Sequence, residues 1–488
     1  MQRIARGIAV VALAGLAWWL IGLRHSLIHA VTTYDAEPSE PASLAGGDGA
    51  GLSPAARVRV VLIDGLSARV AHDLPAWSAV CKRGLDLRVD VGFPTVSLPV
   101  EAALWTGLTQ QQTGIVYRSD VPIVPPLADS IPAKLADSIA VAENHGYIVR
   151  SLGFHQVEPP GDDDAKAWEA AWQSHAATAI GGPARLVFVH ILRVDHAGHT
   201  DGEASDDYAK VARDADAILA SFVAIDPDAR WFVLSDHGHL AGGGHGGEER
   251  EVRQVQGCIA GPDVAAGRGE LVHVVDVARA IADSTGVVLD KASPARPMFV
   301  AIAHPLDPEQ AVVPTPLRTG AIAIAILLVG LVASWVMARP WWIGPWWFAI
   351  ACLSLVMIRG EPTLSMRMVY AWEGRTMYVT WLPAVAVAAV SAYAGLARTT
   401  LVRVIAALLA LPACAAIATI TVCGAWPTIV GAEVAPVVPR FTAWLSPLVL
   451  VTAHGAAAVA LAVLARLVRS AFDRRSPAEP SRTAPAAG

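Results

Sequence analysis

Charged residues are scarce in this chain, at 16% of its 488 residues against 54% hydrophobic residues. The two signs nearly cancel, leaving a net charge of −6, and no basic patch indicates binding to a nucleic acid polymer. Cysteine is rare too, with five in all. Three of these lie in apolar runs. Cys81 and Cys258 share the polar middle of the chain, where a disulfide is permitted but its pairing stays open.

The hydrophobic residues are concentrated in runs that approach the ~20 residues needed to span a bilayer. There are six such runs, at 8–23, 319–338, 341–358, 378–396, 401–424 and 445–468. Arg3 and Arg6 precede the first run, which is also typical of a cleaved signal peptide. The bulky residues after it do not form a small-residue cleavage site, so an uncleaved signal anchor is favoured. We therefore expect an integral protein of the plasma or inner membrane.

Arginines in the short flanks predict its orientation. Those on the expected cytoplasmic side are Arg3, Arg6, Arg339, Arg398, Arg403, Arg466, Arg469, Arg474 and Arg475. Both termini are then cytoplasmic and the polar middle is extracytoplasmic. The loop 359–375 carries three arginines on the opposite side. This is either an exception to the rule or a basic rim that meets anionic lipid headgroups.

The composition changes along the chain predict its domains. We expect a signal anchor at 1–34, a linker at 35–54, an extracytoplasmic domain at 55–300, a second linker at 301–318, a five-helix transmembrane domain at 319–470 and a disordered cytoplasmic tail at 471–488.

The polar domain alternates between strand and helix patterns. Apolar runs at 57–64, 186–192 and 230–236 predict strands, and the spacing at 131–146 and 204–224 predicts helices. Strands alternating with helices predict an α/β fold, with a largely parallel sheet covered by helices on both faces.

Each predicted strand ends at or just before an aspartate. These are Asp64, Asp195 and Asp236. One aspartate after a strand is ordinary turn chemistry, but three of them at the ligand-binding edge of a parallel sheet favour a site. The second and third lie in "VDHAGHTDG" (194–202) and "SDHGHLAGGGHGG" (235–247), which are rich in histidine. Carboxylates with imidazoles predict a divalent metal centre.

A hydroxyl segment, "GFPTVSLPVEAALWTG" (92–107), offers Thr95 and Ser97 just before a predicted helix. A serine in this position is most often a helix cap. The same position also places backbone N–H groups beside an anionic phosphate.

Together, and in this order, these motifs resemble the alkaline phosphatase superfamily over approximately 57–290. The resemblance is to the type I phosphodiesterase/nucleotide pyrophosphatase branch, with the GPI ethanolamine phosphate transferases nearby. It includes a helix at 272–287 that looks like the closing helix of this superfamily. It implies a three-layer sandwich of alkaline-phosphatase type beside the transmembrane helices.

The resemblance also implies two divalent metal ions, usually zinc. One would be held by Asp195, His199 and His245, and the other by Asp64, Asp236, His237 and the Ser97 oxygen. Ser97, directly before an x-Pro pair, aligns with the family nucleophile better than Thr95 does. Two metals can deprotonate such a hydroxyl and bridge the phosphoryl oxygens. His190, His196 and His239 are expected to be structural or to support the ligands.

The chain departs from its relatives at Val100 and Glu101. These stand near where nucleotide pyrophosphatases carry a phosphate-binding asparagine, and Glu101 replaces the sulfatase arginine. The runs are also fewer than the spans of the GPI transferases. We expect a membrane-anchored enzyme that forms a phosphoserine and transfers a phosphoethanolamine-type group on a lipid or lipid-linked substrate. A phosphodiesterase, a non-catalytic scaffold and a transporter are the alternatives, and the oligomeric state stays open.

Overall fold

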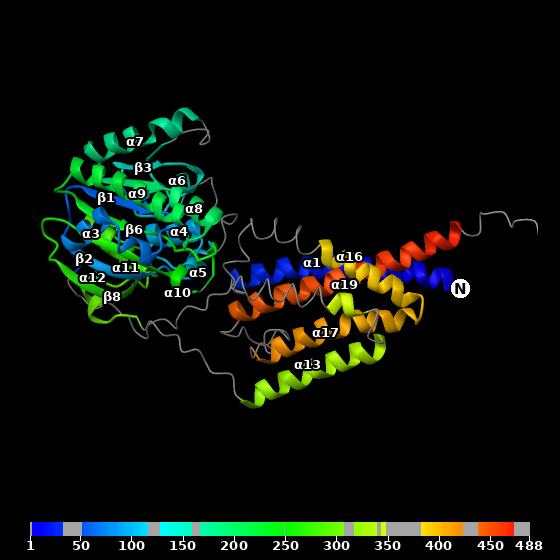
Figure 1. The fold of residues 1–488 in the computed structure, drawn as a ribbon. Coiled ribbons are helices and arrows are strands. Elements are labelled where there is room, and N and C mark those ends of the chain that lie inside the picture. Colours follow the sequence, from blue (N-terminus) through cyan, green and yellow to red (C-terminus); the bar gives the residue numbers. More distant parts are fainter. Residues whose placement is uncertain are drawn as a thin grey trace, which may run out of the picture. The chain divides into compact units, whose positions relative to one another are not determined.

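The computed structural model describes residues 2–32, 51–115, 127–158, 166–247, 249–306, 317–338, 343–347, 382–422 and 438–472. The chain divides into two compact units. The polar middle folds as an α/β unit, and the apolar segments before and after it form a helical unit (Figure 1).

The α/β unit is built on an eight-stranded sheet of order β4-β3-β5-β1-β6-β7-β2-β8. The strands are β1 (Val58–Ile63), β2 (Gly84–Asp90), β3 (Ser138–Ala142), β4 (Gln156–Glu158), β5 (Leu186–Ile191), β6 (Arg230–Leu234), β7 (Gln254–Ala260) and β8 (Gly267–His273). Within this described sheet, β7 alone runs against its neighbours β6 and β2, and the other pairs are parallel. The prediction of a mostly parallel sheet is confirmed.

Helices cover both faces of the sheet. Alternate residues of β1 face opposite sides, with Val60 and Leu62 in one core and Val61 and Ile63 in the other. The first core includes residues of α4 (Ser97–Thr106), α11 (Val274–Thr285) and α12 (Met298–Ala303); the second includes residues of α3 (Pro75–Lys82), α7 (Lys166–Gly181) and α9 (Asp206–Ile225). The unit therefore has three layers with a core on each side of the sheet.

The order of the strands positions the site. β1 lies between β5 and β6, and both pairings are parallel. The carboxyl ends of these three strands therefore meet at one edge, where Asp64, Asp195 and Asp236 follow them.

Two helix predictions are confirmed. The 204–224 pattern is α9, whose first turn is capped because the side chain of Ser205 accepts a hydrogen bond from the Tyr208 amide. The 272–287 pattern is α11, which ends at Gly286 with a left-handed φ of 72°.

The helix expected over 131–146 is wrong. A 3₁₀ turn at Pro132–Lys134 is followed by β3, which pairs with both β4 and β5. The alanines that suggested a helix, Ala140 and Ala142, are buried in the sheet. They alternate with the β-branched residues Ile139 and Val141. Pairing on both edges of the strand outweighs the strong helical preference of alanine, because propensity yields to tertiary context.

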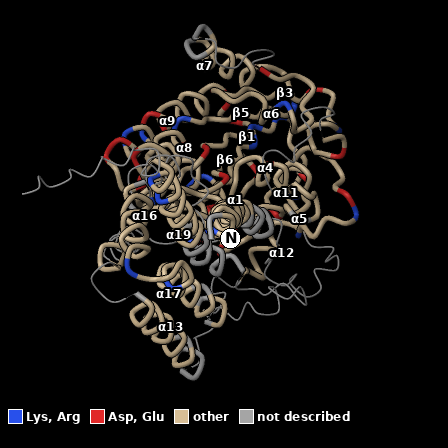
Figure 2. Tube along the Cα trace, turned by 90° about the vertical axis from the view of Figure 1, so that its right-hand side faces the viewer, with Lys and Arg blue, Asp and Glu red and all other residues tan. Residues whose placement is uncertain are grey.

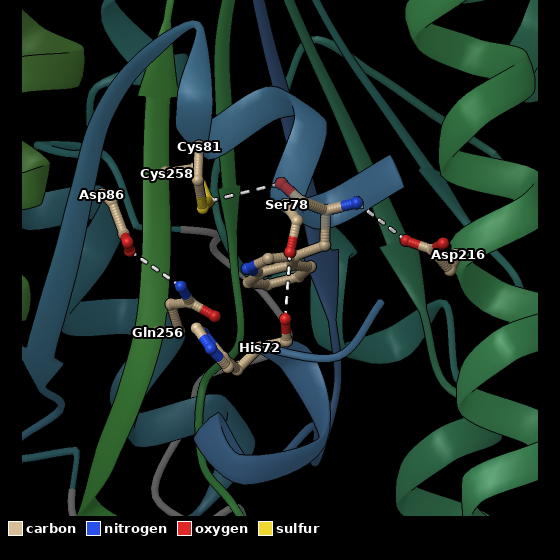
Figure 3. The surroundings of a disulfide bond; sticks show 8 residues. His72, Ser78, Cys81, Asp86, Asp216, Gln256 and Cys258 are labelled. Carbon is tan, nitrogen blue, oxygen red and sulfur yellow. Dashed lines mark hydrogen bonds between the residues drawn. A yellow bond between two sulfur atoms is a disulfide. The ribbon is translucent and has the colours of Figure 1, made fainter. Parts of the chain in front are cut away.

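A disulfide joins Cys81 of α3 to Cys258 of β7, which resolves the pairing that the sequence left open (Figure 3). The same helix is held at its other end by Asp216 of α9. This carboxylate accepts hydrogen bonds from the Ala76 and Trp77 amides at 2.9 and 2.8 Å. α3 is therefore fixed to the sheet at one end and to α9 at the other.

The helical unit contains α1 (Gln2–Thr32), α13 (Leu317–Ala338), α16 (Leu382–Leu396), α17 (Leu401–Val422) and α19 (Val438–Phe472). Among the described residues, two stretches are long and apolar enough to cross a bilayer, Ile4–Gly22 and Val451–Phe472. Shorter apolar stretches lie in α13, α16 and α17. The run at 341–358 lies mostly outside the described residues. Figure 2 shows these helices mostly uncharged, with a few lysine or arginine positions near α16, α17 and α19.

Arginine at the end of α19 ties it to α16. The Arg466 guanidinium lies 4.7 Å from the centre of the Tyr393 ring and donates a hydrogen bond to the Tyr393 carbonyl. Such a contact satisfies the charge while the helix body stays apolar.

Replacing Asp216 by alanine removes both acceptors from the first turn of α3. We expect Asp216→Ala to lower the free energy of unfolding by ~1–3 kcal/mol, since two buried amides lose their partner. Chemical denaturation of the purified protein measures the change. Asp214→Ala is the matched control, because Asp214 is exposed and lies on α9, the helix that carries Asp216. Equal stability of the two variants would contradict this role of Asp216.

Candidate metal centre

Tight local geometry brings the strand ends together. Asp64 is fully buried directly after β1, and Gly65 turns the chain with φ of 71°. A Cβ at Gly65 would lie 2.7 Å from the Asp195 Cα, so glycine is required by space as well as by φ. Asp195 and His199 lie one turn apart on α8 (Arg193–Asp201), and therefore share one face of that helix.

The first donor group consists of Asp195, His199 and His245, which we call the half-buried triad. The Nε2 atoms of the two histidines are 3.2 Å apart. Asp195 Oδ2 is 3.4 Å from His199 Nε2, and Asp195 Oδ1 is 3.5 Å from His245 Nε2. Their donor atoms all lie within 4.8 Å of one another, close enough to share one ion.

The second donor group consists of Asp64, Asp236 and His237, which we call the buried triad. His237 Nε2 lies 3.3 Å from Asp64 Oδ1 and 3.4 Å from Asp236 Oδ2. The Ser97 hydroxyl faces this group. Its Oγ is 3.2 Å from His237 Nε2 and 3.4 Å from Asp64 Oδ1.

The two triads adjoin. The rings of His237 and His245 stack with their centres 3.7 Å apart and their planes 7° apart. His237 Nε2 also lies 3.9 Å from Asp195 Oδ1. The structure thus brings all seven residues singled out in the sequence, Ser97 included, into one continuous site.

Burial and mutual charge shape the ionisation of this site. Burial and the neighbouring Asp64 raise the pKa of Asp236 well above its usual range. Burial lowers the pKa of His237, but Asp236 and Asp64 outweigh this and raise it to about 10. Burial and the adjacent His237 lower the pKa of His245 well below its usual range, so this imidazole is neutral and able to bind a metal.

The residues present fit a divalent cation. In the described part of the chain, Asp236 Oδ2 is buried and has no hydrogen-bond partner. Such an atom costs free energy unless something compensates it. Two groups of carboxylate and imidazole donors, each able to share one ion, match the ligands that zinc takes in proteins.

Ser97 is free to react because it does not cap its helix. It is the first residue of α4, and the preceding Val96 holds the cap position without a side-chain hydrogen bond. The α4 helix, predicted after Ser97, is therefore present, and the hydroxyl points toward the buried triad rather than toward backbone amides.

Thr95, the other hydroxyl considered in the sequence, is fully buried and bonded to backbone. Its Oγ1 donates to the Gly247 carbonyl at 2.9 Å and accepts from the Gly246 amide at 2.8 Å. The Thr95 carbonyl lies 2.8 Å from His245 Nδ1. This contact leaves His245 Nε2 directed at His199 and Asp195, the other two members of the half-buried triad.

Three histidines outside the two triads, His190, His196 and His239, differ in burial and in their contacts with the site. His239 Nε2 contacts Asp195 Oδ1 at 2.9 Å, while His239 Nδ1 accepts from the Gly244 amide, so both ring nitrogens have partners. His190 is buried behind Asp64. His196 is exposed on α8. Two of the three thus contact a carboxylate of the site.

Glu101 also belongs to this region, which sequence reasoning missed because it treated Glu101 only as a departure from relatives. It is fully buried on α4, one turn after Ser97. The sequence does contain a signal for it. Glu101 is the single carboxylate in the apolar stretch "LPVEAALW" (98–105), and its spacing of four residues places it on the same helix face as Ser97.

No family model matches this chain, and no curated protein is similar to it. Among solved structures, it is similar to murine ectonucleotide pyrophosphatase/phosphodiesterase 5, with 16% identity, 50% of this chain and 98% of that chain covered, and a TM-score of 0.41. A phosphonate monoester hydrolase of Agrobacterium radiobacter shows 12% identity, 51% and 78% coverage, and a TM-score of 0.39.

A third solved structure is a protein in the alkaline phosphatase superfamily from Vibrio parahaemolyticus. It shows 14% identity, 58% and 78% coverage, and a TM-score of 0.35. Similarity of this degree does not establish an activity for the present chain.

Removing a donor from either triad should remove metal without unfolding the chain. We expect the wild-type chain supplied with zinc to bind two ions, and Asp236→Asn and His199→Ala each to bind one or none, since each variant lacks one of the three side-chain donors of a triad. Elemental analysis of purified protein measures this. His196→Ala, exposed on the same helix as His199, is the control and should retain both ions. Two ions in all three variants would disprove the assignment.

Zinc affinity should rise with pH. The pKa of His237 is raised to about 10 in the metal-free site, so its imidazole is protonated at neutral pH and must lose that proton to bind zinc. We expect at least ~10-fold tighter binding per pH unit between roughly pH 6 and 8. Competition with a zinc chelator at several pH values gives the slope, and a flat profile would contradict it.

Proposed function

We propose that the chain is a two-metal phosphoryl-transfer enzyme of the alkaline phosphatase superfamily, with Ser97 as its nucleophile. One observation carries this proposal. The Ser97 hydroxyl lies at the carboxyl edge of a mostly parallel sheet, free of any capping role, and faces the buried triad, which adjoins the half-buried triad.

We assign the metal ligands to the two triads. Asp195, His199 and His245 would hold one divalent ion, which we take as zinc, and Asp64, Asp236 and His237 would hold the other beside Ser97. Bound ions of this kind favour the alkoxide form of a hydroxyl and neutralise charge on a phosphoryl group.

The side chains then support an in-line displacement. Ser97 Oγ, oriented by Asp64 Oδ1 and His237 Nε2, forms a bond to phosphorus as the bond to the leaving oxygen breaks. The Ser97 hydroxyl gives up its proton as Oγ attacks, and the leaving oxygen takes up a proton and departs as an alcohol. In the second half-reaction, water or an acceptor hydroxyl attacks phosphorus and releases Ser97.

A lipid or lipid-linked phosphodiester is the substrate that we favour, with transfer of a phosphoethanolamine-type group. Two helical stretches that could cross a bilayer, and further apolar helices in the same unit, support a membrane-embedded enzyme. We propose six spans with both termini cytoplasmic on the basis of the six apolar runs and the arginines that flank them in the sequence. The disulfide between Cys81 and Cys258 supports an extracytoplasmic α/β unit, because such bonds persist in oxidising compartments.

Hydrolysis of a phosphodiester is the second candidate, since both reactions share the first half-reaction. A scaffold without activity is less consistent with the site, because every donor singled out in the sequence is present and placed with the others.

The test uses full-length protein in detergent, phosphatidylethanolamine labelled in the headgroup and a membrane extract. Label in a new lipid or glycan indicates transfer, and label released only into water indicates hydrolysis. Ser97→Ala should abolish both, by a factor of ~10³ or more as expected for a lost nucleophile.

Thr95→Ala is the matched control. It should cost far less, because it loses backbone hydrogen bonds but keeps the attacking oxygen. Mass spectrometry of the acid-quenched reaction should place the phosphorylated adduct on Ser97. An adduct on Thr95, or near-normal turnover of Ser97→Ala, would show that the nucleophile is assigned wrongly.

A further inference from the structure

A buried carboxylate lies behind the site without an obvious structural use. Glu101 follows Ser97 by one turn of α4 and is fully buried, as are its neighbours Val100 and Ala102. Burial raises its pKa, and the opposing effect of His190 does not cancel this rise. In the described part of the chain, neither the Glu101 carboxylate oxygens nor Asp64 Oδ2 nor the His190 ring nitrogens have a partner that meets hydrogen-bond geometry, so these three side chains meet at ion-pair distance without a well-aligned hydrogen bond. An apolar residue would fill this place at lower cost.

His190 links this carboxylate to the site. It lies on β5, and its Nε2 is 3.1 Å from Glu101 Oε1 and 3.1 Å from Asp64 Oδ2. All three side chains are fully buried. The imidazole of His190 on β5 therefore lies between the carboxylate of Glu101, which is on α4, and that of Asp64, which follows β1.

The other oxygen of Asp64 faces the reacting side. Asp64 Oδ1 is 3.3 Å from His237 Nε2 and 3.4 Å from Ser97 Oγ. The rotation of this one carboxylate thus decides whether Oδ1 is directed at Ser97. His190 contacts Oδ2, which is the position from which that rotation can be restrained.

We infer that Glu101 and His190 are positioning residues that hold the Asp64 carboxylate with Oδ1 toward Ser97 and the buried triad. Glu101 restrains the imidazole, and the imidazole restrains Oδ2. This inference rests on the proposed metal centre. Removal of a residue that orients a ligand typically weakens metal binding ~10–100-fold.

Zinc titration of full-length protein, with a competing chelator, tests the inference in two variants of Glu101. Glu101→Leu keeps the volume and removes the acceptor, and we expect ~10-fold or greater weakening at one of two sites. Glu101→Gln keeps an acceptor oxygen for His190 and should bind both ions within a few-fold of wild type. His190→Leu breaks the same link from the strand and should reproduce the one-site weakening even where Glu101→Leu does not fold.

Val100→Ala is the matched control. It opens a small cavity beside Glu101, so it should lower the melting temperature while leaving both zinc affinities unchanged. A general structural effect of the Leu variants would instead weaken both sites together, in step with the loss of stability.

Three results would overturn the inference while leaving the proposed function in place. They are unchanged affinities in Glu101→Leu and His190→Leu, equal weakening in Glu101→Gln and Glu101→Leu, and a third zinc ion in wild type that Glu101→Leu loses. The last would make Asp64, His190 and Glu101 a cation site themselves. Wild-type protein that binds no zinc would remove the proposed function, and this inference with it.

Discussion

Four carboxylates converge at one edge of the sheet, and the energetics of the site depend on how their charge is compensated. Asp64, Asp236 and Glu101 are fully buried, and Asp195 is mostly buried beside them. Like charges removed from water destabilise one another unless cations or hydrogen-bond donors intervene. The histidines supply part of the compensation, and the pKa of Asp236 stays well above its usual range even so. We interpret the remaining imbalance as the reason why divalent cations are needed there.

Two apolar cores, a disulfide and the contacts of Asp216 stabilise the α/β unit that carries this concentration of charge. Parallel pairing of β1 with β5 and β6 brings three strand ends together. Gly65 then lets the first strand end approach α8 more closely than any side chain would allow. The disulfide and the Asp216 contacts hold α3 against the sheet.

Much of this arrangement could be predicted from the sequence, because strand ends and metal-type donors leave local signals. Asp64, Asp195 and Asp236 follow apolar runs that only a shared sheet edge brings together. Contacts between distant residues leave no such signal. The strand at Ser138–Ala142 resembled a helix because its alanines favour helices, and only the pairing with β4 and β5 makes it a strand. Glu101 was missed because its meaning depends on His190, which is distant in sequence.

The central claim is that two divalent ions occupy the two triads in the folded protein. Crystals of the full-length protein grown with zinc, and measured on both sides of the zinc absorption edge, test it directly. The account predicts two anomalous peaks, one bounded by Asp64, Asp236 and His237 and the other by Asp195, His199 and His245. A map with no peak at these residues, or with zinc bound only elsewhere on the protein, would contradict it.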